Sequence, residues 1–490
     1  MIEIKAGPIV GEVIDDNSNI VAYRGIPYAA PPVGGLRWKE PQPVTPWQEI
    51  RRCVEFGPAC PQSEVFFSDL LINESPSLIS EDCLYLNVWC CASAERRPVM
   101  VWIHGGGFDS GWGHQRGFDG AALARKGVVV VTINYRLGIF GFFAHPLLSL
   151  ASAERTSGNY GLLDQIAALS WVQDNISAFG GDPNCVTIFG ESAGAMSVNL
   201  LRRSPLAEGL FHRAISQSAP GGVQIGPNLR AQEVQGKRLS DKLLPESDSD
   251  VITELLGLSA HKLLQQTINN RPIQELITSN TVVNTFSFGP VIDEWVLPSE
   301  GFTHDVPLML GINAEEGAYW ASLEELSFVM ESVENFEAFV RWRAGEHAIS
   351  LLELYPAKTR DDIRKAFIEY FTDTTFAKST REVAAAMSDA FSNTYLYCFS
   401  RRKIDAPINA AYHSAEIGYV FNNLCTAEEV DVRLSDTLSS IWVQFATTGD
   451  PNDQRLPKWP VYDADSEQYI DFNTEISVCE GLRKKTCEQL

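Results

Sequence analysis

One serine in the chain stands in a pattern that is typical of a nucleophile. The run VTIFGESAGAMS places Ser192 within a Gly-x-Ser-x-Gly motif. The apolar residues before the motif predict a strand, and residues 193–201 after it predict a helix. A serine on so sharp a turn needs glycine on both sides, because a side chain at Gly190 or Gly194 would collide with the neighbouring strand or helix. The pattern predicts a serine hydroxyl presented for nucleophilic attack beside a helix N-terminus.

A glycine run lies earlier in the chain. The residues WIHGGGF place Gly105, Gly106 and Gly107 directly after a predicted strand. Acyl transfer builds negative charge on a carbonyl oxygen, and backbone N–H donors must already be in place to receive it. Consecutive glycines permit the close approach that such donors need. The alternative interpretation, a flexible glycine turn, is less favoured because the run follows a strand and precedes the serine motif.

Both motifs lie in an alternation of predicted elements. The predicted strands cover residues 84–89, 99–103, 128–133, 186–189, 214–216 and 306–310, and the predicted helices cover 162–177, 193–201, 382–391 and 434–447. This alternation predicts an α/β fold with a mostly parallel central sheet flanked by helices. Residues 220–284 are polar and helical in pattern, and they are predicted to form a helical insertion.

Composition limits the class of protein and its partners. The chain has 490 residues, of which 45% are hydrophobic and 21% charged, so it is long enough to bury a substantial globular core. Its 62 acidic residues against 39 Lys and Arg give a net charge of −23, which disfavours nucleic acid and anionic membranes as partners. Without a signal-peptide pattern or a membrane-spanning run, we expect a cytoplasmic protein, or a secreted one if a leader has been removed. No cysteine pair has metal-site spacing, so neither a metal nor a cofactor is expected.

Further motifs extend over nearly the whole chain, and together they match one family. They are YRGIPYA at 23–29, PPVG at 31–34, SEDCLYLNV at 80–88, NYRLG at 134–138, GNYGLLDQ at 158–165 and FGGDPN at 179–184. In this order they resemble the type B carboxylesterases, the α/β-hydrolase family that also contains cholinesterases and certain fungal lipases. Among these the chain resembles the microbial carboxylesterases of the para-nitrobenzyl esterase type. The resemblance implies an α/β-hydrolase fold with a helical cap and a gorge, and hydrolysis of small-molecule carboxylic esters.

The resemblance also assigns the partners of Ser192. In GINAEEG the family pattern places the acid directly before the last glycine, which selects Glu316 over Glu315. In AYHSAEI the histidine before the Glu-Ile pair corresponds to the family's base, which selects His413 among eight histidines. The chain order of serine, acid and histidine is the one that this fold requires. Because these three positions must converge, residues 1–490 are predicted to form one domain.

The implied reaction is that of a serine esterase. His413 takes the proton of Ser192, Glu316 orients the imidazole, and an acyl-enzyme forms and is hydrolysed. The family match implies that the oxyanion is held by the backbone N–H groups of Gly106, Gly107 and Ala193.

Several other matches imply supporting roles. Cys60 and Cys83 match a family disulfide. The resemblance further implies ion pairs of Arg37 with Glu81 and of Arg136 with Asp164, and support of the site by Glu191 and by a Ser218–Glu416 pair.

The chain also departs from the cholinesterases. Their cation-binding tryptophan is replaced by Asn73, which disfavours choline esters and points to uncharged esters of small or medium size. Aromatic walls for the gorge are expected from Trp112 and Trp320, and acyl selectivity from Phe286 and Phe288. No cysteine lies between Cys185 and Cys398, so a second family disulfide cannot form.

Two alternatives to a carboxylesterase remain, and the oligomeric state, monomer or dimer, also stays open. A lipase would need a larger apolar lid than the loop between Cys60 and Cys83 offers. A non-catalytic adhesion or scaffold protein of the cholinesterase-like type would typically lack a member of the catalytic triad.

Overall fold

The computed structural model describes residues 1–15, 19–62, 74–92, 96–221, 226–245, 250–267, 288–301, 304–388, 392–404, 406–424 and 428–490. Its centre is an 11-stranded sheet with the order β14-β13-β12-β11-β10-β9-β7-β8-β6-β4-β3. The strands are β3 (Glu12–Asp15), β4 (Ile20–Pro27), β6 (Tyr85–Cys91), β7 (Arg97–Ile103), β8 (Val129–Ile133), β9 (Gly181–Glu191), β10 (Arg213–Gln217), β11 (Leu308–Asn313), β12 (Thr394–Phe399), β13 (Gln468–Phe472) and β14 (Ser477–Glu480). A separate 3-stranded sheet joins β1 (Ile2–Ile4), β2 (Gly7–Val10) and β5 (Arg51–Arg52).

The central strands are parallel, as the sequence predicts. From β8 through β7, β9, β10, β11 and β12 to β13, every neighbouring pair is parallel, whereas β3, β4, β6 and β14 pair antiparallel at the two edges. Parallel strands direct their carboxyl ends to one edge of the sheet, so the loops after β7, β9, β11 and β12 lie close together. The segments after these four strands carry the predicted catalytic triad and oxyanion donors.

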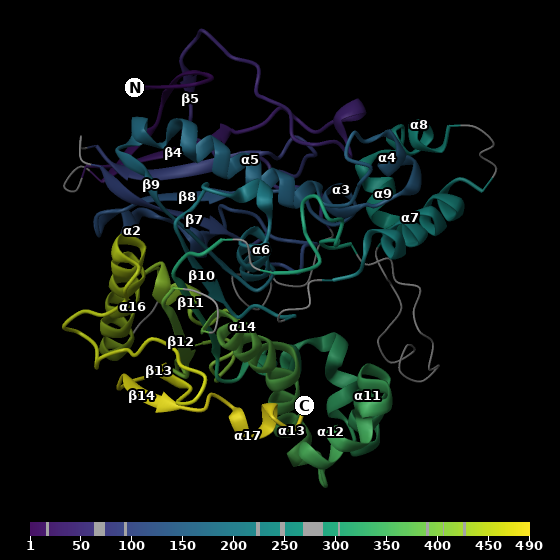
Figure 1. Cartoon of the computed structure of the whole chain (residues 1–490), viewed down its shortest axis with the longest axis vertical. Helices are drawn as coiled ribbons and strands as arrows, with labels where there is room; N and C mark the ends of the chain where they lie inside the picture. The colour runs from purple at the N-terminus through teal and green to yellow at the C-terminus, as the bar shows by residue number, and fades with distance from the viewer. Residues whose placement is uncertain are drawn as a thin grey trace.

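Both faces of the sheet are buried at its centre, which explains why central strands such as β7 and β8 are apolar. In β7, Val99, Val101 and Ile103 belong to one core, and the alternating Met100 and Trp102 belong to the other. The first core includes α3 (Gly138–Phe142), α5 (Tyr160–Asn175), α6 (Ala193–Leu201) and α14 (Lys378–Ser388). The second is covered by α2 (Ala121–Arg125), α15 (Ile417–Val420) and α16 (Glu429–Thr448), of which α2 and α16 lie side by side in Figure 1.

The remaining helices form two groups away from the sheet (Figure 1). One group contains α4 (Pro146–Ala151), α7 (Leu229–Leu243), α8 (Val251–Leu256) and α9 (Ala260–Thr267), and the last three fall within the stretch predicted as an insertion. The other contains α11 (Val333–Ala344), α12 (Ala348–Leu354) and α13 (Arg360–Thr372), which continues through a π-helical turn (Asp373–Ala377) into α14. A short α17 (Lys484–Cys487) packs against that turn. In the described ranges no helix is both long and apolar enough to cross a membrane.

Two predicted ion pairs are confirmed. Arg136 and Asp164 are almost fully buried, and the guanidinium donates to both carboxylate oxygens at 2.7 Å. Arg37 likewise donates to both oxygens of Glu81 at 2.6 Å. The third nitrogen of Arg37 donates to the carbonyls of Leu255, Leu256 and Leu258, and so caps the end of α8.

The predicted Cys60–Cys83 disulfide is not formed in the structure, which corrects that expectation. Both residues are buried free thiols, and the Cys83 thiol shares a hydrogen bond with Cys60. Burial raises the pKa of Cys83 well above its usual value, so the protonated, unreactive thiol is the favoured form.

Candidate active site

Ser192 occupies a strained turn between β9 and α6. Its φ of 56° and ψ of −121° lie outside the regions that non-glycine residues normally adopt. A Cβ at Gly190 would lie 2.6 Å from the carbonyl oxygen of Ile103, so the glycine is required by the approach of β7. The Ser192 N–H donates to the carbonyl of Gln217 at 2.9 Å, which ties the turn to the end of β10. The neighbouring strands β7 and β10 thus keep the turn in its strained conformation. Ser192 lies directly before the first residue of α6.

Glu316 and His413 meet beside this turn. His413 Nδ1 lies 2.6 Å from Glu316 Oε2, and both side chains are 0% exposed. The other oxygen of Glu316 accepts the N–H of Asn313 at 2.8 Å, so the carboxylate is fixed on both sides. Glu315 instead pairs with Arg402 near the surface, at 2.6 Å. Of the two adjacent acids, Glu316 is therefore the one that contacts the histidine.

The second nitrogen of His413 faces another carboxylate. Nε2 lies 3.0 Å from Glu191 Oε1, and it has no hydrogen-bond partner among the described residues. Ser414 Oγ donates to the same Glu191 oxygen at 2.5 Å. The hydrogen bond from Ser192 Oγ to Nε2 that a triad needs is therefore not made in this state. Such bonds often form only when substrate is in place.

These carboxylates change the acid–base behaviour of the histidine. Burial by itself lowers the pKa of His413, but the negative charges of Glu191 and Glu316 outweigh it and raise the pKa to about 9. Burial also raises the pKa of Glu191 to about 8, against the opposing effect of the imidazolium. The site thus stabilises a positively charged imidazole, which is the form that a general base acquires after it takes a proton.

Glu416 has a different set of partners from the one expected. It is fully buried and accepts hydrogen bonds from Gln217 Nε2 at 3.0 Å and Asn313 Nδ2 at 2.6 Å. Gln217 is held in turn by Trp442 Nε1 at 3.1 Å. Ser218 Oγ has no hydrogen-bond partner among the described residues, so the predicted Ser218–Glu416 pair is wrong. The amides of Gln217 and Asn313 satisfy the carboxylate instead, and no motif in the sequence pointed to them.

The glycine run after β7 forms a tight loop beside Ser192. Gly106 and Gly107 have φ of 102° and 64°, in the region that favours glycine. The N–H groups of Asp109 and Ser110 both donate to the carbonyl of Gly106 at 3.0 Å, which fixes the loop. Ala193 is the first residue of α6, so its N–H has no intrahelical acceptor. The predicted oxyanion donors thus lie on a closed loop and a helix N-terminus.

His104 supports that loop as a neutral residue. It is buried, its ring stacks on Tyr135 with centroids 4.5 Å apart, and Nδ1 lies 2.8 Å from the carbonyl of Gly105. Burial lowers the pKa of His104 to about 4, so the ring carries no charge near neutral pH.

Aromatic rings surround the His413 imidazole. The ring centroids of Trp320 and Phe376 lie 4.9 and 4.8 Å from that of His413, and Tyr319 lies at 6.5 Å. Trp320 was expected near the site, whereas Phe376 was not, because it lies on the π-helical turn far from any motif.

Two other predicted pocket residues, Trp112 and Phe288, are buried, with 4% and 9% of their surface exposed. The ring centroid of Phe288 lies 6.4 Å from that of Phe143 in the core. Phe286 and Asn73 lie outside the described residues.

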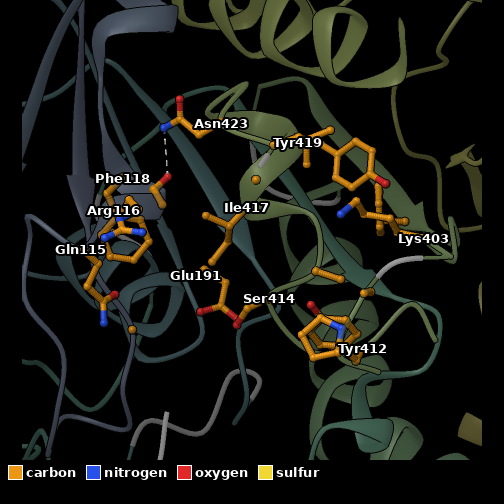
Figure 2. A pocket seen from close by; sticks show the side chains of 18 of the residues that line it. Gln115, Arg116, Phe118, Glu191, Lys403, Tyr412, Ser414, Ile417, Tyr419 and Asn423 are labelled. Carbon is orange, nitrogen blue, oxygen red and sulfur yellow. Dashed lines mark hydrogen bonds between the residues drawn. The ribbon is translucent and has the colours of Figure 1, made fainter. Parts of the chain in front are cut away.

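A cavity of about 370 Å³ opens beside the site (Figure 2). Its lining includes Gly105, Gly106, Glu191 and Ser414, which belong to the site or lie next to it. Within the described ranges no group of three or more His, Cys, Asp or Glu residues is arranged to hold a metal ion.

Comparison with known proteins agrees with this geometry. The whole chain, residues 1–490, matches the model of the carboxylesterase family. The chain is 36% identical to fumonisin B1 esterase of Sphingopyxis macrogoltabida over 495 residues, which cover 96% of this chain and 87% of that protein. It is also 36% identical to para-nitrobenzyl esterase of Bacillus subtilis (strain 168) over 475 residues, which cover 93% and 92% of the two chains. A solved structure titled PNB esterase matches with a TM-score of 0.82 and 32% identity, and it covers 100% of this chain and 99% of that chain.

The sheet, its flanking helices and the serine turn define an α/β-hydrolase. The chain belongs to the carboxylesterase family, and it is a carboxylic ester hydrolase. The non-catalytic alternative is set aside on these findings.

Proposed function

We propose that the chain hydrolyses carboxylic esters through an acyl-enzyme on Ser192, with His413 as general base and Glu316 as the acid that orients it. The observation that carries this proposal is the buried 2.6 Å contact of His413 Nδ1 with Glu316, next to the strained turn of Ser192. A contact of this kind fixes the tautomer that leaves Nε2 able to accept a proton.

In the proposed first half-reaction, Ser192 Oγ attacks the ester carbonyl and its proton passes to His413 Nε2. The oxyanion is stabilised by the N–H groups of Gly106, Gly107 and Ala193. The C–O bond to the alcohol then breaks, and the imidazolium gives its proton to the leaving oxygen. In the second half-reaction, water loses a proton to His413, attacks the acyl-enzyme, and releases the carboxylic acid as Ser192 regains its proton.

Replacement of the nucleophile tests the proposal. Ser192→Ala removes the attacking oxygen, so we expect kcat for para-nitrophenyl acetate to fall by on the order of 10⁴-fold or more. An organophosphate should add one covalent adduct to the wild type and none to the variant in intact-mass spectra. Ser350→Ala, an exposed serine on α12, is the matched control and should keep full activity and labelling. Esterase activity retained by Ser192→Ala would refute the assignment.

A further inference from the structure

The cavity beside the site lies close to His413 Nε2, the nitrogen that protonates the leaving alcohol in the proposed reaction. Neither Ser192 nor His413 lines it, but Glu191 does, and Glu191 Oε1 lies 3.0 Å from His413 Nε2. A Cβ at Gly105, another lining residue, would lie 3.1 Å from Ser192 Cβ. In the proposed reaction Nε2 delivers a proton to the departing alcohol. The cavity therefore lies on the side of the site where the alcohol part of an ester leaves.

The charge of this cavity is the reverse of that of the whole chain. Among the residues that the structure describes, its lining contains three basic residues, Arg116, Arg401 and Lys403, and one acidic residue, Glu191. The chain as a whole has 62 acidic residues against 39 Lys and Arg. Figure 2 shows Arg116 beside Phe118 on one wall and Lys403 beside Tyr419 on the opposite wall. A basic lining in a strongly acidic protein indicates a local preference for an anion.

The three bases differ in how far their charge is compensated. Arg401 donates to Asp431 at 2.8 Å and to Glu428 at 3.2 Å, so its charge is balanced. Arg116 is exposed, and its guanidinium forms no ion pair with any residue that the structure describes. Only its backbone N–H is bonded, to Glu74 at 2.8 Å, which holds the residue in place. Arg116 is therefore the cation that is available to a ligand.

Glu191, the acidic residue of the lining, does not cancel this preference. Its carboxylate lies 3.0 Å from His413 Nε2 and accepts a hydrogen bond from Ser414 Oγ, so its charge is paired within the catalytic site. The lining also includes the apolar residues Phe118, Phe399, Ile417 and Leu424. An apolar wall with a few polar groups, within a few hundred Å³, is the form of a small-molecule site.

We propose that this cavity holds the alcohol part of a carboxylate-bearing ester, whose carboxylate pairs with Arg116 while Lys403 adds positive charge from the opposite wall. The inference rests on the proposed esterase function. It differs from the sequence-based prediction, which favoured uncharged esters as substrates. Its physical basis is that a guanidinium binds a carboxylate through two parallel N–H···O bonds.

A pair of esters that differ only in one carboxylate tests the inference. Benzyl acetate and 4-(acetoxymethyl)benzoate share the acyl group and the benzylic leaving oxygen. We expect wild type to show the higher kcat/KM for the carboxylate ester. Arg116→Ala should lower the ratio of the two kcat/KM values by about three- to tenfold, Arg116→Glu should lower it further, and Arg116→Lys should keep part of it. Added salt should reduce the wild-type ratio, because the arginine is exposed.

The control is Arg230→Ala, an exposed arginine at the start of α7 that lies outside the cavity lining; it should leave the ratio unchanged. A ratio that Arg116→Ala and Arg116→Glu change no more than this control would overturn the inference while the esterase function stands. If wild type hydrolyses neither benzyl acetate nor 4-(acetoxymethyl)benzoate, the proposed esterase function itself is contradicted. Thermal melting of each variant identifies any loss that comes from misfolding.

Discussion

Two carboxylates face the imidazole of His413 from opposite sides. Glu316 contacts Nδ1 at 2.6 Å, and Glu191 lies 3.0 Å from Nε2. Both stabilise the imidazolium, but they are not equivalent, because in the proposed reaction Nε2 is also the nitrogen that accepts the Ser192 proton. Glu191 therefore raises the basicity of His413 and at the same time occupies the side of the ring where the serine has to bind. The hydrogen bond from Ser414 to Glu191 draws this carboxyl toward Ser414 as well.

Glu191→Gln separates these two effects. The charge of Glu191 is the largest contribution that raises the pKa of His413 to about 9, so its removal should lower that pKa. Because the neutral imidazole is the base in the proposed reaction, the acidic limb of the kcat/KM profile should move to lower pH, by about one unit. Profiles recorded from about pH 6 to pH 10 measure this shift. The exposed Glu49→Gln is the control. An acidic limb that stays in place would show that Glu191 does not set the basicity of His413.

The same raised pKa affects stability. Native His413 binds its proton more tightly than an unfolded histidine, whose pKa is about 6.5. Its protonation therefore stabilises the fold fully below about pH 6.5, and this contribution is lost as the pH rises through about 9.

Among the elements, the turn between β9 and α6 depends most on close backbone packing. A Cβ at Gly194 would collide with the carbonyl oxygen of Ile103 at the end of β7. Strand β7 also leads into the loop of Gly106 and Gly107. Any shift of β7 away from the added methyl group therefore moves Ser192 and the predicted oxyanion donors relative to each other.

Gly194→Ala should therefore damage both folding and chemistry. We expect a loss of about 1–3 kcal/mol in the free energy of unfolding, because a methyl group is forced against a fixed backbone. A shift of the serine turn by about 1 Å would lower kcat by roughly 100-fold. Urea unfolding and kcat for para-nitrophenyl acetate measure the two effects. Gly35→Ala is the matched control, since a Cβ there meets nothing within 4 Å. Equal behaviour of the two variants would show that the turn tolerates the methyl group.

The sequence predicted the inner strands well and the outer ones poorly. The predicted strands at 99–103, 128–133 and 186–189 lie within or closely overlap β7, β8 and β9, and the predicted helix at 193–201 coincides with α6. Strands buried on both faces have continuous apolar sequences, which makes them easy to recognise. The strands β12 and β13 were not predicted, because they mix aromatic and polar residues, as in QYIDF of β13, and β14 was not predicted because it has only four residues, SVCE. The π-helical turn has no sequence signal that distinguishes it from ordinary helix.

At the scale of the whole molecule, the site is assembled from segments that are distant in the chain. Pattern alone pointed to Ser192 and to the glycine loop, since both have local motifs. Glu316 and His413 came from the family resemblance, because nothing in their spacing distinguishes them from other acids and histidines. The partners of Glu416 and the position of Phe376 could not be predicted, since they depend on how strands and helices pack in three dimensions.

The segment near residue 483 is connected to the site through the π-helical turn. Arg483 Nε donates to Asp373, which is fully buried and also accepts the hydroxyl of Tyr355 at 2.9 Å. Asp373 begins the turn that carries Phe376 against the ring of His413. Arg483, which is far from Ser192 in sequence, thus helps to fix the surroundings of His413, the proposed general base.

Arg483→Ala should therefore lower both stability and kcat. Removal of the guanidinium leaves Asp373 as a buried charge with one remaining partner, which costs about 3 kcal/mol in the free energy of unfolding. The turn that carries Phe376 loses its anchor, so kcat should fall several-fold while KM changes little, because Phe376 contacts the histidine rather than the described substrate cavity. Adding Asp373→Asn removes the unpaired charge and should restore part of the stability. Urea unfolding and steady-state kinetics of both variants measure these effects, with the exposed Lys485→Ala as control. If Arg483→Ala unfolds at the same urea concentration as Lys485→Ala, the ion pair does not anchor the turn.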